Sequence, residues 1–285
     1  MRRKAAIVAI GAAAALAAGS AFARETAHNA ATTVDTSFRS KALDSRIHFL
    51  IHLPAGYRAS GKRYPVVYFL HGLPAGPAAY RSVAWVAAAL DATGRAAILV
   101  IPQGARRAHG DPEYHDWGPG HNWETALAVE LPAYVDAHYR TIASRDGRAT
   151  VGLSAGGYGA TILGVHHLAR FGAIESWSGY FRPTDPTGQT TLDVGNDADN
   201  AYASVHRLVP QLAKQLRRYP TFIAFYVGKD DPTFVADNEQ LDRELTAARI
   251  RHDFDLYPGG HTNALWQAHA RRWLELALTH LRASA

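Results

Sequence analysis

Short apolar runs alternate with longer amphipathic segments along most of this chain of 285 residues. The runs are continuous and end at glycine or proline, as in PVVYFLHG and AAILVIP, whereas the segments between them repeat apolar residues every three or four positions. Continuous apolar strands that alternate with helices are typical of a mostly parallel sheet covered on both faces. We therefore predict strands at 47–53, 65–72, 96–102, 149–153, 173–179, 222–228 and 252–260.

The amphipathic segments complete the pattern of an α/β protein. They predict helices at 82–90, 124–139, 155–170, 202–218, 238–248 and 264–281. No repeat of fixed period and no second block of different composition interrupts this order, so we expect a single α/β domain over residues 37–285. The preceding residues, 24–36, are polar and rich in alanine and threonine, which predicts a flexible leader.

The first residues have the pattern of a secretory signal peptide. A basic start, MRRK, precedes an apolar stretch, and Ala21 and Ala23 provide an A-x-A cleavage site, so we predict a signal peptide over residues 1–23. The alternative is a membrane anchor, but the apolar run is short and alanine-rich for a stable span. We expect a secreted protein and leave open its export route, general or twin-arginine, and its destination, the periplasm or the medium.

Charge and cysteine content exclude several classes of function. Cleavage after Ala23 would remove three basic residues and no acid, which lowers the formal net charge from +5 to +2. No basic run remains that would indicate nucleic-acid binding, and we expect no stable membrane insertion of the mature chain. The chain has no cysteine, which excludes a thiol nucleophile and a cysteine-based metal site. The oligomeric state stays open.

Two long stretches, residues 103–123 and 180–200, fit neither a helix nor a strand. Each follows the carboxyl end of a strand, where open α/β sheets bind ligands. Their aromatic residues, together with one near the C-terminus, could stack on a sugar or an aromatic acid, and ordinary packing is the alternative for each. The candidates for substrate binding are Tyr114, Trp123, Tyr180 and Trp266, and Trp117 and Phe181 share the same loops.

Calcium has to be considered for the second stretch because it is rich in Asp and Asn. It lacks the spacing of an EF-hand, in which a glycine and a terminal glutamate stand at fixed positions. We therefore predict no metal site.

The segment ATVGLSAGGYGATIL places Gly152, Ser154 and Gly156 in the spacing G-x-S-x-G. A predicted strand precedes the serine and a predicted helix follows it, which is the context that a nucleophilic serine on a sharp turn requires. The first N–H groups of the helix and the positive end of its dipole would favour a developing oxyanion. This pattern predicts Ser154 as a nucleophile.

A serine hydroxyl needs a base that removes its proton, and an acid that orients the base. His261 follows the last predicted strand, and Asp230 and Asp231 follow the strand before it. The chain order serine, acid, histidine is the one that such a hydrolase requires. The pattern predicts His261 as the base and leaves both aspartates open as the acid.

Two backbone N–H groups are expected to hold the oxyanion. One belongs to Ala155, directly after the nucleophile. The other belongs to Leu73, after the turn at His71-Gly72 that ends an earlier strand. We expect His71 itself to brace this turn rather than to take part in the reaction.

With these residues in place, the chain resembles the esterase branch of the α/β-hydrolases that includes S-formylglutathione hydrolases, feruloyl and acetyl-xylan esterases, siderophore esterases and mycolyltransferases. The resemblance covers nearly all of the mature chain, through YFLHG, RATVGLSAGGYGATILG, WSGYF, YVGKDDPTF and PGGHTNALW. It implies an α/β-hydrolase fold with a minimal cap of loops. It also implies Ser154 as nucleophile, His261 as base, Leu73 and Ala155 as oxyanion donors, and Asp231 as the acid.

The chain departs from the family pattern at two places. Ala155 stands where the family commonly has methionine, and Pro102-Gln103-Gly104 stands where it often has Pro-Asp-Gly. Neither change touches the three predicted catalytic residues, but the second could alter the substrate pocket.

The expected function is that of a secreted serine carboxylesterase that forms an acyl-enzyme, needs no cofactor and acts on a small-molecule or glycan-linked ester. An acyltransferase that passes the acyl group to a sugar hydroxyl is the nearest alternative. A binding protein of the cell envelope that has lost catalysis, and a peptidase, are further alternatives. The acyl and alcohol parts of the substrate stay open.

Overall fold

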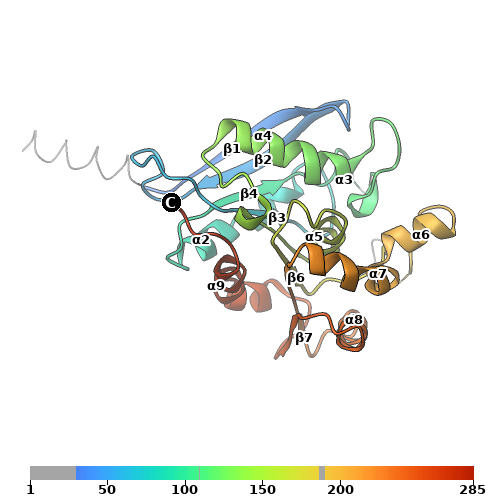
Figure 1. Cartoon of the computed structure of the whole chain (residues 1–285). Helices are drawn as coiled ribbons and strands as arrows, with labels where there is room; N and C mark the ends of the chain where they lie inside the picture. Colours follow the sequence, from blue (N-terminus) through green and yellow to red (C-terminus); the bar gives the residue numbers. More distant parts are fainter. Residues whose placement is uncertain (1–29, 109, 186–189) are drawn as a thin grey trace, which may run out of the picture.

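The computed structural model describes residues 30–108, 110–185 and 190–285, and its centre is an eight-stranded sheet in the order β1-β2-β4-β3-β5-β6-β7-β8 (Figure 1). β2 runs antiparallel to both of its neighbours, and every pair from β4 to β8 is parallel. The strands are β1 (Thr32–Ser40), β2 (Ser45–Leu53), β3 (Val66–Leu70), β4 (Ile98–Pro102), β5 (Arg148–Leu153), β6 (Ala173–Trp177), β7 (Phe222–Gly228) and β8 (Asp253–Tyr257).

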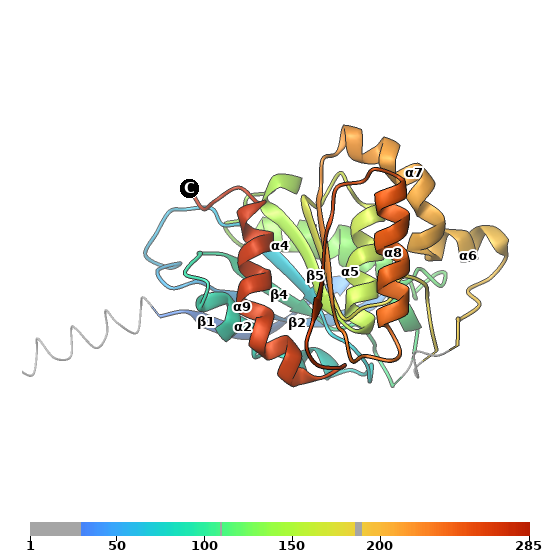
Figure 2. The same cartoon turned by 90° about the horizontal axis from the view of Figure 1, so that it is seen from below.

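Helices cover both faces of this sheet, as Figures 1 and 2 show. α2 and α9 pack on one face, and α4, α5, α7 and α8 pack on the other. The helices are α2 (Val86–Asp91), α3 (Trp123–Thr125), α4 (Leu131–His138), α5 (Ala155–His166), α6 (Asp197–Ala203), α7 (Val205–Arg218), α8 (Val235–Ala247) and α9 (Asn263–Thr279). Shorter helical turns are η1 (Ala79–Val83), η2 (Pro112–Tyr114), the π turn η3 (Ala126–Glu130) and η4 (Arg145–Gly147). The predicted α/β architecture is confirmed.

The alternation of side chains along β3 explains why its sequence is continuously apolar. Val66 and Tyr68 belong to the core beneath α5, whereas Val67 and Phe69 belong to the core beneath α2 and α9. Successive side chains of a strand point to opposite faces, so a strand between two helical layers buries all of them.

β1 corrects the predicted flexible leader. The leader was expected to reach residue 36, but residues from Thr32 onward pair with β2, in a register that runs from Thr32 opposite Leu53 to Ser40 opposite Ser45. β1 is an edge strand in which only Phe38 and Ser40 are buried, so it lacks the apolar run that identified the inner strands. The signal peptide predicted at 1–23 and residues 24–29 of the leader lie outside the described residues.

The helical prediction at 202–218 also needs correction, because Ser204 separates α6 from α7.

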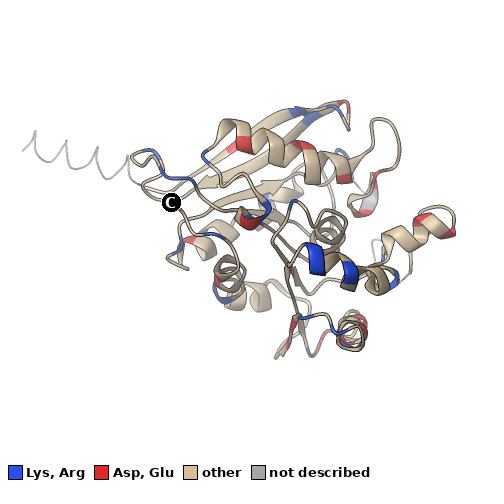
Figure 3. Cartoon of the chain, viewed as in Figure 1, with Lys and Arg blue, Asp and Glu red and all other residues tan. Residues whose placement is uncertain are grey.

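Figure 3 shows acidic and basic residues spread over most elements in this view, with Lys and Arg on the last turns of α7. Cations are favourable there because the carbonyl end of a helix carries partial negative charge. Within the described part of the chain, no helix combines the length and the apolar character that crossing a membrane requires.

Glu175 is a fully buried carboxylic acid in the middle of β6. Its oxygens accept hydrogen bonds from Trp177 Nε1 at 3.2 Å and from Tyr226 Oη at 3.4 Å. Burial disfavours the charged form and raises the pKa of Glu175 to about 8.

This pKa predicts a pH-dependent stability that Glu175→Gln removes. A carboxyl group with a raised pKa in the folded state contributes stability that is fully present below about pH 4.5 and is lost as the pH rises through 8. The loss amounts to about 4 kcal/mol at pH 8. Urea unfolding of both proteins at pH 5 and pH 8.5 measures it, and we expect the glutamine variant to lose much less stability between the two. Equal losses in both proteins would contradict the raised pKa.

Candidate active site

Ser154 lies on the turn between β5 and α5, in a backbone conformation that residues other than glycine rarely adopt (φ 55°, ψ −125°). The turn is tight because its neighbours are glycines. A Cβ atom on Gly152 would lie 2.1 Å from the carbonyl oxygen of Gly156, and one on Gly156 would lie 2.1 Å from that of Leu70. Both glycines are therefore required for this turn, as the G-x-S-x-G spacing predicted.

Ser154, His261 and Asp231 are joined by hydrogen bonds. His261 Nε2 lies 2.9 Å from Ser154 Oγ, and His261 Nδ1 lies 2.8 Å from Asp231 Oδ2. The three side chains follow β5, β8 and β7, whose carboxyl ends meet at one edge of the sheet. Because the carboxylate accepts the Nδ1 proton, Nε2 is left to accept the proton of Ser154.

The two aspartates that the sequence left open have different surroundings. Asp231 is fully buried and faces His261, whereas Asp230 is exposed and its Oδ2 accepts the N–H of Gly259 at 3.0 Å. The second oxygen of Asp231, Oδ1, accepts the N–H groups of Thr233 and Phe234 at 3.0 and 3.1 Å. The structure thus places Asp231, and not Asp230, beside the imidazole.

The electrostatics of Asp231 keep it ionised. Burial opposes its charge, but the hydrogen bond and charge of His261, with the two backbone N–H groups, hold the pKa of Asp231 below its ordinary value. An ionised acceptor at this position fixes the tautomer of His261 and would stabilise its protonated form.

The N–H groups of Leu73 and Ala155 are available to a ligand, since no acceptor for either is found among the described residues. The turn before Leu73 passes directly over the nucleophile, because a Cβ on Gly72 would lie 2.9 Å from Ser154 Cβ. These two positions agree with the expected oxyanion donors.

His71 braces the turn that carries Leu73. Its Nε2 accepts the N–H of Gly104 at 3.1 Å, so its Nδ1 donates to the carbonyl oxygen of Gly72 at 2.8 Å. In a planar trans peptide the C=O of Gly72 and the N–H of Leu73 point in opposite directions. Holding the carbonyl therefore also sets the direction of the Leu73 N–H. Burial lowers the pKa of His71, although the bond to Gly72 opposes this, and the ring stays neutral.

The four aromatic residues predicted to bind substrate are all buried, which corrects that prediction. Tyr114 donates its hydroxyl to the carbonyl oxygen of His71 at 2.5 Å, and Trp123 donates to Asp111 at 3.2 Å. Tyr180 donates to Glu113 at 2.8 Å. These hydrogen bonds link the two loops to each other and to the turn at His71. Phe181, from the same loops, is buried as well.

Trp266 departs from the prediction in another way. Only 7% of the residue is exposed, and its Nε1 donates to Ser178 Oγ at 3.0 Å. Its ring stands perpendicular to the imidazole of His261, with 5.0 Å between the ring centres. It therefore touches the predicted base rather than presenting a face to solvent. No local sequence pattern indicates its partner Ser178, which lies 88 residues away in the chain.

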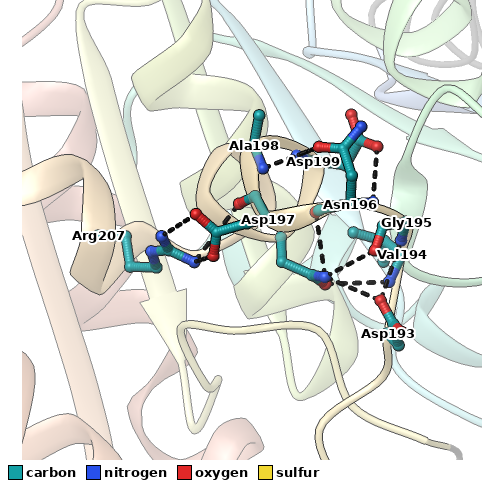
Figure 4. A network of polar contacts seen from close by, with 9 residues as sticks. Asp193, Val194, Gly195, Asn196, Asp197, Ala198, Asp199 and Arg207 are labelled. Carbon is teal, nitrogen blue, oxygen red and sulfur yellow. Dashed lines mark hydrogen bonds and ion pairs between the residues drawn. The ribbon is translucent and has the colours of Figure 1, made fainter.

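The Asp- and Asn-rich stretch caps a helix (Figure 4). The side chain of Asn196 accepts the N–H groups of Ala198 and Asp199, and Asp199 accepts the N–H of Asn196 in return. Asp197 pairs with Arg207, and Asp193 accepts from Asn200. Within the described ranges no group of three or more ligating side chains could hold a metal ion.

Comparison with known proteins identifies the family and the fold. A family model described as “Putative esterase” matches residues 40–271. The chain belongs to this esterase family. A solved structure of a ferulic acid esterase superposes with a TM-score of 0.74 at 26% identity, over 88% of this chain and 99% of that one. The fold is that of the α/β-hydrolase esterases.

Two curated relatives of this chain are named for different activities. Esterase Rv1288 of Mycobacterium tuberculosis is 26% identical in an alignment 249 residues long, which covers 79% of this chain and 54% of that protein. Diacylglycerol acyltransferase/mycolyltransferase Ag85A of Mycobacterium leprae is 24% identical in an alignment 193 residues long, which covers 59% of this chain and 57% of that protein. The chain thus spans about half the length of the curated relatives it matches.

Proposed function

We propose that the protein is a serine esterase that hydrolyses a carboxylic ester through an acyl-enzyme. The observation that carries the proposal is the chain of hydrogen bonds from Ser154 through His261 to Asp231, beside two N–H groups for which the described residues provide no acceptor. Membership of the esterase family supports it.

The geometry supports the following reaction. Ser154 Oγ forms a bond to the ester carbonyl carbon while its proton passes to His261 Nε2. The N–H groups of Leu73 and Ala155 hold the negatively charged oxygen. The bond to the alcohol breaks, and the alcohol oxygen takes the proton from His261. Water then repeats the sequence at the acyl carbon, which releases the carboxylic acid and restores Ser154.

An acyltransferase would share the first half of this reaction and would use a sugar hydroxyl in place of water. The name of the Mycobacterium leprae relative favours keeping this alternative. The burial of Tyr114, Trp123, Tyr180 and Phe181 argues against it, since rings that are covered by protein cannot stack on a sugar acceptor. Trp117 is the exception among the loop aromatics, because it is only partly buried.

One assay separates the two functions. The protein is given 4-nitrophenyl acetate, butyrate and ferulate, each with and without an excess of trehalose or glucose, and the free acid and the acyl sugar are both quantified. We expect free acid to match nitrophenol release in every case. Acyl sugar as the main product would favour the transferase, and no release from any ester would contradict both.

A further inference from the structure

Two aromatic rings pack against the imidazole of His261. The ring centre of Phe234 is 5.0 Å from that of His261, with 56° between the planes, and the ring centre of Trp266 is also 5.0 Å away, with 88° between the planes. Both aromatic residues are 7% exposed. Phe234 immediately precedes α8 and Trp266 lies in the first turn of α9, so each wall comes from the helix that follows one of the loops of the site.

Phe234 and Trp266 are both linked by hydrogen bonds to one turn after β6, formed by Ser178 and Gly179. Ser178 Oγ accepts the indole N–H of Trp266 at 3.0 Å. Asn238 Nδ2 donates both to the carbonyl oxygen of Gly179, at 2.8 Å, and to that of Phe234, at 2.9 Å. The turn thus links the start of α8 to the first turn of α9, and an aromatic residue from each contacts His261.

The turn itself has little freedom. Ser178 is fully buried at φ 49°, and its N–H donates to the carbonyl oxygen of Tyr226 at 2.6 Å. A Cβ on Gly179 would lie 2.2 Å from Ser176 Oγ and 2.9 Å from the carbonyl carbon of Gly157, in the first turn of α5. A buried side chain at positive φ is costly and is kept only where its surroundings determine it.

We propose that Ser178 and Trp266 are positioning residues for the base His261, which act by holding its ring in the plane that reaches Ser154 and Asp231 together. This inference rests on the proposed function. In the reaction, His261 receives a proton from Ser154 and gives it to an alcohol oxygen at a different position, while its bond to Asp231 persists. A ring free to tilt would lose one of these bonds, and small misplacements of reacting groups lower rates strongly.

The test removes the hydrogen bond between Trp266 and Ser178 by changing each partner in turn. Trp266→Phe keeps an aromatic wall without the indole N–H, and Ser178→Ala removes the acceptor. We expect each variant to lower kcat by between about tenfold and a hundredfold with little change in KM. Removing support from the bond between His261 and Asp231 should also shift the acidic limb of the pH profile of kcat/KM to lower pH. The double variant should lose no more than either single one, because all three lack the same bond.

Trp273→Phe is the matched control. Trp273 is also buried in α9, packs against Trp177 and Tyr226, and has no hydrogen-bond partner for its Nε1 in the described part of the chain. It should lower Tm and leave kcat and the pH profile unchanged.

Three outcomes would overturn the proposal. One is a rise in KM at unchanged kcat for Trp266→Phe, which would make Trp266 a substrate wall. Another is a loss of activity that follows Tm equally in the 266 and 273 variants. The third is an unchanged NMR signal of the His261 Nδ1 proton in Trp266→Phe. This signal is measured in protein with 15N-labelled histidine, and it is identified by its loss in His261→Gln. A positioning role predicts that it broadens in Trp266→Phe. Because NMR needs no substrate, wild-type protein that hydrolyses no ester would contradict the proposed function without deciding this inference.

Discussion

Replacing Ser154 with alanine is expected to lower kcat/KM for ester hydrolysis by at least about 10⁴-fold. Alanine offers no atom that can form the acyl-enzyme, so the attack would fall to water without a positioned nucleophile. The N–H groups of Leu73 and Ala155 would remain and could still polarise the carbonyl, which explains why a small residual rate is expected. The side chain of Ser154 makes its one hydrogen bond in the described structure to His261, so folding should be little affected.

Two measurements check this prediction. Turnover of 4-nitrophenyl acetate is compared for wild type and Ser154→Ala. The Tm of both proteins is measured as well, to check that the variant is folded. In parallel, wild-type protein is treated with a fluorophosphonate, and mass spectrometry of the peptides should place the adduct on Ser154. Full activity of the alanine variant, or an adduct on another residue, would contradict the role given to Ser154.

Asp231→Asn is expected to lower kcat by about 10⁴-fold. The backbone N–H groups of Thr233 and Phe234 donate to Oδ1 and will select the amide oxygen of asparagine at that position. The amide NH₂ then faces His261 Nδ1 and forces the proton of the ring onto Nε2. In this tautomer Nε2 cannot accept the proton of Ser154, although the arrangement of atoms is nearly unchanged.

Asp230→Asn is the matched control, since it makes the same change one residue earlier. An amide oxygen can still accept the N–H of Gly259, so activity should stay within about threefold of wild type. A larger loss in the 230 variant than in the 231 variant would reverse the assignment of the acid.

Acid unfolding gives a second check on Asp231. Its pKa is lowered in the folded protein, so the carboxylate contributes stability above the ordinary pKa of aspartate, and this is lost as the pH falls through the folded value. Asp231→Asn lacks this contribution at every pH. The difference in stability between the two proteins should therefore shrink as the pH falls from 6 to below 3.

The core of the site could be predicted because it depends on local sequence. Gly152 must lack a side chain because the carbonyl group of Gly156 lies only four residues further along the chain, and His261 follows the last strand. The carbonyl group that requires glycine at 156 belongs to Leu70 of β3, and there the G-x-S-x-G spacing alone identified the position. The choice between Asp230 and Asp231 depends instead on which side chain faces a histidine 30 residues away, and no local pattern carries that information.

The prediction that four aromatic residues bind substrate failed for a related reason. Tyr180 is buried through a bond to Glu113, 67 residues earlier, and Trp266 through its bond to Ser178. A polar loop sequence gives no sign of such partners, so burial could not be separated from exposure. β1 was missed because an edge strand needs few apolar residues and is stabilised by pairing with β2.

The turn around Ser154 also limits how this enzyme can be redesigned. Positions 152 and 156 accept no side chain, because even one methyl group would enter the space of a backbone carbonyl. A variant library that includes these two positions would therefore lose most members to misfolding. Ala155 contributes through its N–H, so its side chain can be varied as far as its buried surroundings allow. Changes of specificity are best sought on the surrounding loops, with the backbone from Leu153 to Gly157 left intact.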